Sequence, residues 1–404
     1  MKYSYHKKKF PDDILVYIEE FDKKNRTVLF DFYDSNEFSM FSEYSNASLS
    51  MEKPTMILLK NYNGRNIQEN TYYSIKRETI SNWGKSTLMS EIENSLLIAF
   101  SINLSNFNFT KEIFTHSVSV NNDFESSNLI YGRRNIDDLM FDLKGQIKVN
   151  VRNVGQGNWN EVNKDDTFIL VYDCGTNVDA KYSDIRILID QRITNYRNDK
   201  PVFILSHWDK DHYHCLLGMT DEELSYFSKY IFRNDVPNLT SRKLYSRIAS
   251  ATSVANIYAI GADERIPKVR VTSLRPLNNT SNQIVLYNSQ YHKNRNISGL
   301  VLSLKTANSS VVFSGDCQYL QVSQFVLPHL NYKHDHFLIV PHHGGKAGKY
   351  IYDNPSNMKL KKAIISVGKN TYRHPDKVYL SCLNDTFDNI DTTFETQSDI
   401  LINL

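Results

Sequence analysis

The segment LSHWDKDHYH, residues 205–214, concentrates side chains that bind metal ions in proteins. Within six residues, directly after an apolar strand-like run, it places four potential ligands: His207, Asp209, Asp211 and His212. Alternate residues of an extended loop point to the same side, so His207 and Asp209 can bind one cation. Asp211 and His212 can then face a second cation nearby. Two cations about 3.5–4 Å apart can activate a water molecule and stabilise the attacking and leaving oxygens of a phosphodiester.

Further motifs place polar residues and glycines at the ends of strand-like runs. They are VGQGN at 154–158, YDCG at 172–175, VVFSGDC at 311–317, IVPHHGG at 339–345 and SVGKNTYRHP at 366–375. Because α/β proteins place their sites at the carboxyl ends of strands, we expect the polar residues of these motifs to meet. The alternative for residues 205–214 is a solvated loop with a chance cluster, which the preceding buried strand disfavours.

In this order, the six motifs resemble those of metallo-β-lactamase-fold hydrolases of the competence (ComEC) type. The pattern of that family runs VGQGD, DxG, HxHxDH, GD, PHHG and SVGxxNxxxHP. The resemblance covers about residues 146–380 of the chain. It implies an α/β fold, specifically an αββα sandwich, with two divalent metal ions as cofactors. It also implies phosphodiesterase or nuclease activity.

The resemblance also assigns a role to each matched residue. The implied metal ligands are His207, Asp209, Asp211, His212, Asp316 and His342. Among them, Asp316 matches the carboxylate that bridges the two metal ions, and Asp211 is also placed to accept a proton.

Other matched residues would act around the ligands. Asp173 matches an aspartate that orients the histidine loop, because metal-bound histidines need a partner that fixes their tautomer. Asn158 and His343 are likewise assigned to supporting positions next to the metal ligands. His374, in the last motif, is assigned to catalysis through contact with the substrate or a metal.

The chain departs from the family pattern at several positions. Asp209 replaces the middle histidine of HxHxDH, and an oxygen ligand shifts the preference from Zn²⁺ towards Mn²⁺. Many relatives supply another histidine before the bridging aspartate, but here that interval contains only His292, for which a surface loop is the better interpretation. Asn158 stands where the family has a carboxylate. His214 and Cys215 replace glycines, so His214 is either a substrate contact or a structural residue.

Residues 1–145 predict a separate α+β domain of unknown role. Short strand-like runs alternate there with one stretch, residues 85–100, whose apolar residues have helical spacing. The polar segment 121–138 is the expected linker. A domain appended to an enzyme often contacts the substrate or a protein partner, and we expect one of these roles here.

Residues 146–404 predict the hydrolase domain, in which strands alternate with helices such as those expected at 221–232 and 241–249. This alternation is typical of layered α/β proteins. Buried strands are expected over residues 147–151, 168–172, 201–205, 299–304, 310–313, 337–340 and 363–367.

The composition limits the possible partners and location of the chain. The 47 basic and 45 acidic residues leave a net charge of +2, so a basic track for nucleic acid would have to be local. One candidate track comprises Lys346, Lys349, Lys359, Lys361 and Lys362. The chain has neither a signal peptide nor an apolar run long enough for a membrane helix. Its four widely spaced cysteines fit reduced thiols, which together with these absences predicts a cytoplasmic protein without a membrane partner.

The leading hypothesis is a metal-dependent nuclease that hydrolyses DNA or RNA with two Mn²⁺ or Zn²⁺ ions. One alternative keeps the fold and changes the substrate to a cyclic nucleotide, a lactone or a thioester, because one scaffold serves many reactions. Another is a degenerate, non-catalytic scaffold. Two-domain architecture without a membrane channel suits a stand-alone bacterial enzyme, and antiviral defence is a speculative role for it.

Overall fold

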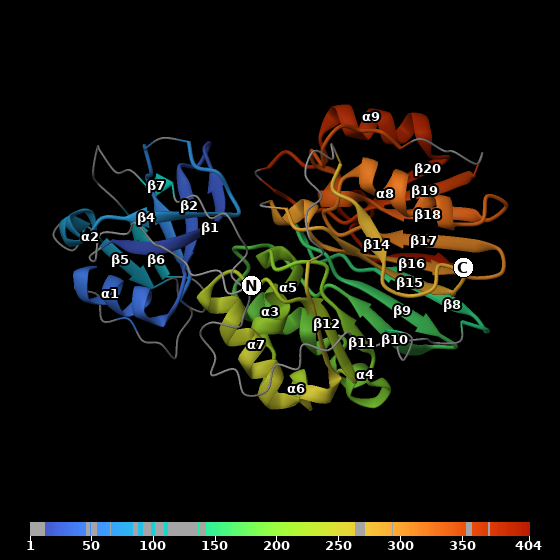
Figure 1. Cartoon of the computed structure of the whole chain (residues 1–404), viewed down its shortest axis with the longest axis horizontal. Coiled ribbons are helices and arrows are strands. Elements are labelled where there is room, and N and C mark those ends of the chain that lie inside the picture. Colours follow the sequence, from blue (N-terminus) through green and yellow to red (C-terminus); the bar gives the residue numbers. More distant parts are fainter. Residues whose placement is uncertain are drawn as a thin grey trace, which may run out of the picture. The chain divides into compact units, whose positions relative to one another are not determined.

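The computed structural model describes residues 13–45, 49, 55–64, 66–83, 88–91, 98–101, 109–111, 136, 143–262, 271–292, 294–352, 358–370 and 372–404. The chain divides into two compact units (Figure 1). Unit 1 comprises Met1–His116 and Pro237–Lys243, and unit 2 comprises Ser117–Val236 and Leu244–Leu404. The linker expected at 121–138 lies outside the described residues except for Ile136, and a boundary at residue 145 stays a prediction.

Unit 1 is built on a sheet with the strand order β5-β6-β3-β2-β1-β4-β7. Its elements are β1 Ile14–Asp22, β2 Thr27–Phe32, α1 Ser35–Ser45, β3 Ile57–Lys60, β4 Thr71–Ile75, α2 Arg77–Trp83, β5 Leu88–Glu91, β6 Ile98–Ser101 and β7 Thr110–Lys111. Phe38 and Phe41 share one face of α1 because they are three residues apart. Their rings lie 5.2 and 5.1 Å from that of Phe32 on β2, and this contact joins the helix to the sheet.

The helix expected at residues 85–100 is wrong in the described part of that stretch. Residues 88–91 and 98–101 form β5 and β6, which pair with each other in antiparallel fashion. Strand β6 also pairs with β3 in parallel. Short apolar runs suit a helix face and a buried strand equally well, and pairing to the existing sheet decides between them.

Helix α7, Leu239–Ala251, begins in unit 1 and belongs to unit 2 from Leu244 on. Within unit 1, a buried carboxylate holds its residue Thr240. Asp31 accepts hydrogen bonds from the main-chain nitrogen of Thr240 at 2.7 Å and from Oγ1 of Thr55 at 2.9 Å. The unpaired N–H groups of a first helical turn are stabilised by such an acceptor. Burial raises the pKa of Asp31.

Unit 2 contains two further sheets. The first has the order β13-β12-β11-β10-β9-β8-β21, and the second has the order β14-β15-β16-β17-β18-β19-β20. Up to β13 its elements are β8 Ile147–Val151, β9 Asn160–Lys164, β10 Thr167–Tyr172, α3 Tyr182–Asp190, α4 Ile193–Asp199, β11 Val202–Ile204, α5 Lys210–Gly218, α6 Asp221–Leu224, β12 Lys229–Arg233, α7, η3 Val254–Asn256 and β13 Ile257–Ile260.

The second half of unit 2 forms the other sheet and its helices, and the last strand returns to the first sheet beside β8. Its elements are β14 Leu274–Pro276, β15 Ile284–Ser289, η4 Arg295–Ile297, β16 Leu300–Lys305, β17 Ser309–Phe313, α8 Tyr319–Phe325, η5 Leu327–His329, β18 Asp335–Ile339, η6 Pro341–Gly344, β19 Lys359–Ile365, α9 Lys377–Thr386, β20 Asn389–Thr392, α10 Thr393–Thr396 and β21 Ile400–Asn403.

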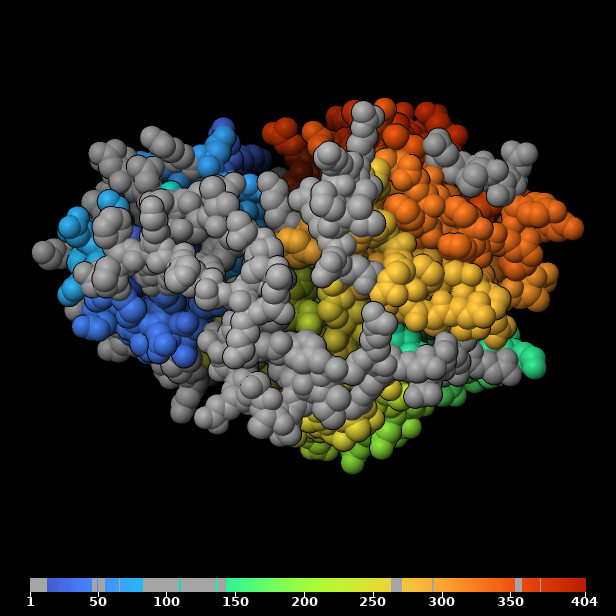
Figure 2. All heavy atoms as spheres, viewed as in Figure 1, coloured from blue at the N-terminus to red at the C-terminus, as the bar shows by residue number. Residues whose placement is uncertain are grey.

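The two sheets of unit 2 pack face to face around one apolar core. Every second residue of β8 and β16 lies in this core, because alternate side chains of a strand point to one face. These core residues include Ile147, Val149, Val151, Leu300, Leu302 and Leu304. In Figure 2, the atoms of residues beyond 300 (orange to red) gather above those of residues 147–230 (green).

Helices cover the outer faces of both sheets. On β16, the intervening residue Val301 packs with Tyr319 and Val322 of α8. On the first sheet, the ring of Phe232 on β12 lies 5.4 Å from that of Tyr245 on α7. Unit 2 is thus a mixed α/β structure compatible with the expected αββα sandwich.

The helix expected at residues 221–232 is only partly confirmed. Helix α6 ends at Leu224, and β12 then runs from Lys229 to Arg233 between β11 and β13. The run YIF at 230–232 consists of aromatic and β-branched residues, which favour a buried parallel strand. The helix expected at 241–249 is confirmed within α7. No helix of the described residues is long and apolar enough to cross a membrane.

Candidate metal centre

The first side of the centre is formed by the loop after β11 and by the start of α5. Buried Ser206 and His207 follow the strand, and Asp209 is the residue that precedes the helix. Asp211 and His212 lie in the first turn of α5. The negative charge of Asp211 is favourable there, because the amino end of a helix carries a partial positive charge.

The second side is formed by residues that follow β17 and β18. Asp316 comes after β17 and is 4% exposed. His342 and His343 lie in the short helix η6 with φ values of 51° and 52°. Left-handed backbone costs about 1 kcal/mol or more per non-glycine residue, so surrounding contacts must hold it. One of them is the hydrogen bond from the nitrogen of His342 to the oxygen of Gly315 at 3.1 Å.

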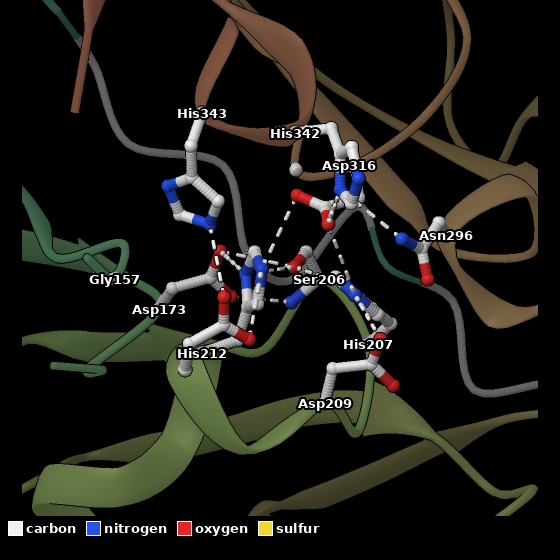
Figure 3. Close-up of polar contacts among 12 residues, drawn as sticks. Gly157, Asp173, Ser206, His207, Asp209, His212, Asn296, Asp316, His342 and His343 are labelled. Atoms are coloured by element: carbon white, nitrogen blue, oxygen red, sulfur yellow. Dashed lines mark hydrogen bonds and ion pairs between the residues drawn. The ribbon is translucent and has the colours of Figure 1, made fainter. Parts of the chain in front are cut away.

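Two groups of potential ligands form where these sides meet. Among the described residues, the groups are His207, His212 and Asp316, and Asp211, His212 and His343. Within each group, the ligand atoms lie within 4.8 Å of one another. His212 Nε2 lies 3.2 Å from Asp316 Oδ1, and His343 Nε2 lies 3.1 Å from Asp211 Oδ2. Figure 3 shows His207 and His212 from the first side pointing towards Asp316 and His343 from the second.

The other two expected ligands lie at the edge of the groups. His342 Nδ1 is 2.5 Å from Asp316 Oδ2, and Asp209 Oδ2 is 3.4 Å from His207 Nε2. All six residues expected as ligands are therefore brought together, and His343 joins them.

The buried imidazoles fit a bound cation. Nε2 of His207, His212 and His343 is buried and takes part in no hydrogen bond. The other ring nitrogen, Nδ1, has a partner in each case. It lies 2.9 Å from the hydroxyl of Ser206 in His207, 2.9 Å from the carboxylate of Asp173 in His212, and 2.8 Å from the carbonyl of Ser366 in His343. Each Nε2 atom faces a carboxylate oxygen at 3.1–3.4 Å without forming a hydrogen bond to it, and a metal ion bound by both groups would supply the missing interaction. The residues present thus fit divalent metal ions.

The electrostatics of the centre favour cations. Burial raises the pKa of Asp316, but His212 and His342 outweigh it and hold that pKa well below its ordinary value. Burial also raises the pKa of Asp211, but His212 and His343 lower it further, to about 2. Burial lowers the pKa of His212, but three aspartates raise it well above its ordinary value. The carboxylates are therefore ionised near neutral pH, and cation binding would displace protons from the histidines.

Asp173 orients the first side of the centre from the end of β10. Its carboxylate accepts hydrogen bonds from the nitrogen of Ser206 at 2.7 Å and from the hydroxyl of Ser206 at 2.9 Å. Its Oδ2 also lies 2.9 Å from Nδ1 of His212. A carboxylate at this position favours a proton on Nδ1 of His212 and directs Nε2 into the centre.

Glycines allow two loops to close on the backbone of α5. Gly175 N donates to the oxygen of Asn158, and Asn158 N donates to the oxygen of Asp211 at 3.1 Å. A Cβ atom on Gly175 would lie 1.6 Å from the oxygen of Asp211, and one on Gly157 would lie 2.9 Å from it. Asn158 therefore supports the centre through its main chain.

Gly175→Ala should destabilise the protein by about 3 kcal/mol or more, because the new methyl group must displace the backbone of Asp211. Urea denaturation of the metal-free protein measures this change. Gly261→Ala is the matched control, since its Cβ would meet only the side chain of Asn234 at 3.6 Å. Equal stability of the two variants would show that the close approach is unimportant.

The last histidines have different surroundings. The ring of His374 lies 5.0 Å from that of His342, and its Nδ1 lies 3.4 Å from Nε2 of Gln156. Burial and the neighbouring histidines lower the pKa of His374 to about 3. His214 is buried one turn after Asp211, with Nδ1 at 2.8 Å from the oxygen of Asn177.

His292 belongs to neither group of ligands. Its Nδ1 accepts a hydrogen bond from the main-chain nitrogen of Asn294 at 3.0 Å, which agrees with a local loop role. His343, predicted at a supporting position, lies in the second group of potential ligands, and two consecutive histidines after a strand are a signal that both reach the centre. One residue near the ligands was not predicted. Asn296, whose Nδ2 lies 3.1 Å from His342 Nδ1, has no motif signal.

No family model matches the chain, and no curated protein matches it either. Among solved structures, the chain is similar to a mutant of the CmlA beta-hydroxylase, with a TM-score of 0.33 and 9% sequence identity. The match covers 65% of this chain and 55% of that chain, so it spans about half of the other protein. A similarity at this level carries no argument about function.

Proposed function

We propose that unit 2 is a metal-dependent phosphodiesterase with a metallo-β-lactamase fold, and that its substrate is nucleic acid. One observation carries the proposal. The two groups of ligands share His212, which lies 3.2 Å from Asp316, and three buried imidazole nitrogens without hydrogen bonds point into them. An arrangement of this kind suits two neighbouring cations.

Each cation would have its own set of ligands. His207, Asp209 and His342 would hold the first, Asp211, His212 and His343 would hold the second, and Asp316 would contribute to both. When bound, the two cations would lower the pKa of a water molecule and stabilise the attacking and leaving oxygens of the diester. The oxygen ligand Asp209, in place of imidazole, favours Mn²⁺ over Zn²⁺.

The chain's own side chains would position protons. A carboxylate with a pKa of about 2 accepts a proton poorly near neutral pH, so we assign Asp211 to cation binding more than to proton transfer. His374 is neutral, since its pKa is about 3. The amide of Gln156 can donate to Nδ1 of His374, which leaves Nε2–H as a donor. That group could donate to the departing oxygen.

Exposed cations near these residues suit a polyanionic substrate. Lys346 is exposed on the loop after His343, where its ammonium group lies 3.8 Å from Asp376 and stays accessible to solvent. Lys369 and Arg373 are exposed on the loop before His374. These two loops are joined by a hydrogen bond from the nitrogen of Asp376 to the oxygen of Gly344 at 2.9 Å. Cations placed in this way would contact phosphates of a nucleic-acid backbone.

Lys349 of the candidate track is exposed on the same loop as Lys346, but the other three lysines lie elsewhere. Lys359, Lys361 and Lys362 lie on β19, towards the end of the strand opposite to the centre. Lys362 lies 2.8 Å from Asp391, and Lys361 lies 3.7 Å from Asp388. The proposed phosphate track is therefore confined to the two loops beside the centre.

A substrate panel tests the proposal. The full-length protein, loaded in turn with Mn²⁺, Zn²⁺ and Mg²⁺, is incubated with single- and double-stranded DNA and RNA, a cyclic nucleotide, a lactone and a thioester. We expect metal-dependent cleavage of a nucleic acid. Turnover of only a small ester or a cyclic nucleotide would move the function to that class. No turnover by the metal-loaded protein would support a non-catalytic scaffold.

A further inference from the structure

The loop before β16 lies directly on the first side of the centre. The nitrogen of Leu300 donates to the oxygen of Ser206 at 2.8 Å, and a Cβ atom on Gly299 would lie 3.0 Å from the same oxygen. Helix η4 lies in this loop and contains Asn296. The side chain of Asn294 caps η4 by accepting from the nitrogen of Asn296 at 3.0 Å. The sequence thus brings Asn296 next to the ligands through short-range contacts.

Buried polar side chains hold this loop in place. Gln321 of α8 is fully buried and donates to the oxygen of Ile297 at 3.1 Å. Arg233 of β12 is also fully buried and donates to Oγ of Ser298 at 3.4 Å. Burial of an amide and a guanidinium is costly without such bonds, so both interactions favour one conformation of the loop. Asn296 is therefore held by a rigid scaffold.

Three polar groups converge beside the first group of ligands. Asn296 Nδ2 lies 3.1 Å from His342 Nδ1, which lies 2.5 Å from Asp316 Oδ2. Figure 3 shows the amide of Asn296 pointing towards His342 and Asp316. Two ligand atoms that share one cation lie about 3.0–3.5 Å apart, given metal–ligand distances of about 2.1 Å. The separation of Asn296 and His342 agrees with this value, whereas His342 and Asp316 lie at the shorter distance of a hydrogen bond, which a cation would have to replace.

Protons alone satisfy these contacts poorly. His342 Nδ1 can donate to Asp316 or accept from the amide of Asn296, but one nitrogen cannot do both. If the amide turns by 180°, its oxygen takes the place of its nitrogen, since the two atoms are alike in size. Once Nδ1 of His342 has also lost its proton, Asp316, His342 and Asn296 all present lone pairs, and a cation among them would satisfy all three.

We propose that the amide oxygen of Asn296 is a ligand of the first cation. It would take the position for which the chain has no suitable histidine, because His292 faces its own loop. The inference rests on the two-cation centre of the proposed function, and it adds a further hard oxygen ligand to the side that already contains Asp209. Such ligands favour Mn²⁺ or Mg²⁺ over Zn²⁺.

Titration of the metal-free, full-length protein with Mn²⁺ tests the inference without an activity assay. The wild type should bind two ions. Asn296→Ala should weaken one of them by about 10- to 100-fold. Asn296→Asp should keep both ions bound, because it retains an oxygen ligand. The exposed residue Asn308 provides a matched control, and Asn308→Ala should leave both affinities unchanged.

Unchanged affinities in Asn296→Ala, or fewer than two ions in the wild type, would overturn the inference. Asn296→Asp also guards against misfolding, since loss of an ion in both variants would indicate damage to the loop and count against a ligand role. Failure of the substrate panel would leave this result standing, because the titration measures binding alone. If the wild type cleaves nucleic acid in the substrate panel but Asn296→Ala binds Mn²⁺ as tightly as the wild type, the proposed phosphodiesterase stands and Asn296 is not a ligand.

Discussion

Asp211→Asn should reduce metal-dependent cleavage by at least about 1,000-fold, which corresponds to about 4 kcal/mol of lost transition-state stabilisation. The carboxylate of Asp211 lies 3.1 Å from His343 Nε2 and 3.8 Å from His212 Nε2. Asparagine has nearly the same size but no charge. The second cation would therefore lose an anionic ligand, while the packing around α5 would be retained.

Cleavage rates at saturating Mn²⁺ measure this effect, with urea denaturation of the metal-free proteins as the folding check. Asp385→Asn changes an exposed carboxylate of α9 in the same unit and should leave the rate unchanged. Full activity in a folded Asp211→Asn protein would remove Asp211 from the centre.

Asp173→Ala should lower both the stability of the protein and its affinity for metal. The variant removes one acceptor from the main chain of Ser206, one from its hydroxyl and one from His212 Nδ1. Because these donors are buried, their loss should reduce the free energy of unfolding by about 3 kcal/mol. A histidine without its orienting partner should bind metal about 10- to 100-fold more weakly.

Urea denaturation of the metal-free protein and titration with Mn²⁺ measure the two effects separately. Asp179→Ala removes an exposed carboxylate close by in the chain and serves as the control. A stability loss with normal metal affinity would make Asp173 structural only. Normal values in both experiments would contradict its orienting role.

The strands that position the centre were largely predictable from the sequence. The alternation at 147–151 and the apolar run at 168–172 correspond to β8 and β10. The strands in residues 85–100 were not predictable, because the apolar spacing of this stretch fits a helix. Its described parts, β5 and β6, pair with each other, and β6 also pairs with β3. Residues 230–232 likewise became a central strand through pairing on both sides. Pairing partners distant in sequence decide such cases, and local periodicity does not contain them.

The site was predictable where ligands follow a strand within one short segment. The pair His342 and His343 shows the limit, because their left-handed backbone decides which nitrogen faces which carboxylate. Asn296 lies beyond that limit, since its position depends on Gln321 and Arg233 from distant elements. Residues of this kind belong to no motif and emerge only when the chain is folded.

Electron paramagnetic resonance of the Mn²⁺-loaded wild type tests the central claim most directly, since that claim is a pair of cations joined by Asp316. Two Mn²⁺ ions that share a carboxylate are magnetically coupled, and we expect the spectrum of a coupled pair when two ions are bound per chain. A spectrum of isolated Mn²⁺ at full occupancy would contradict the two-cation centre and the phosphodiester mechanism built on it.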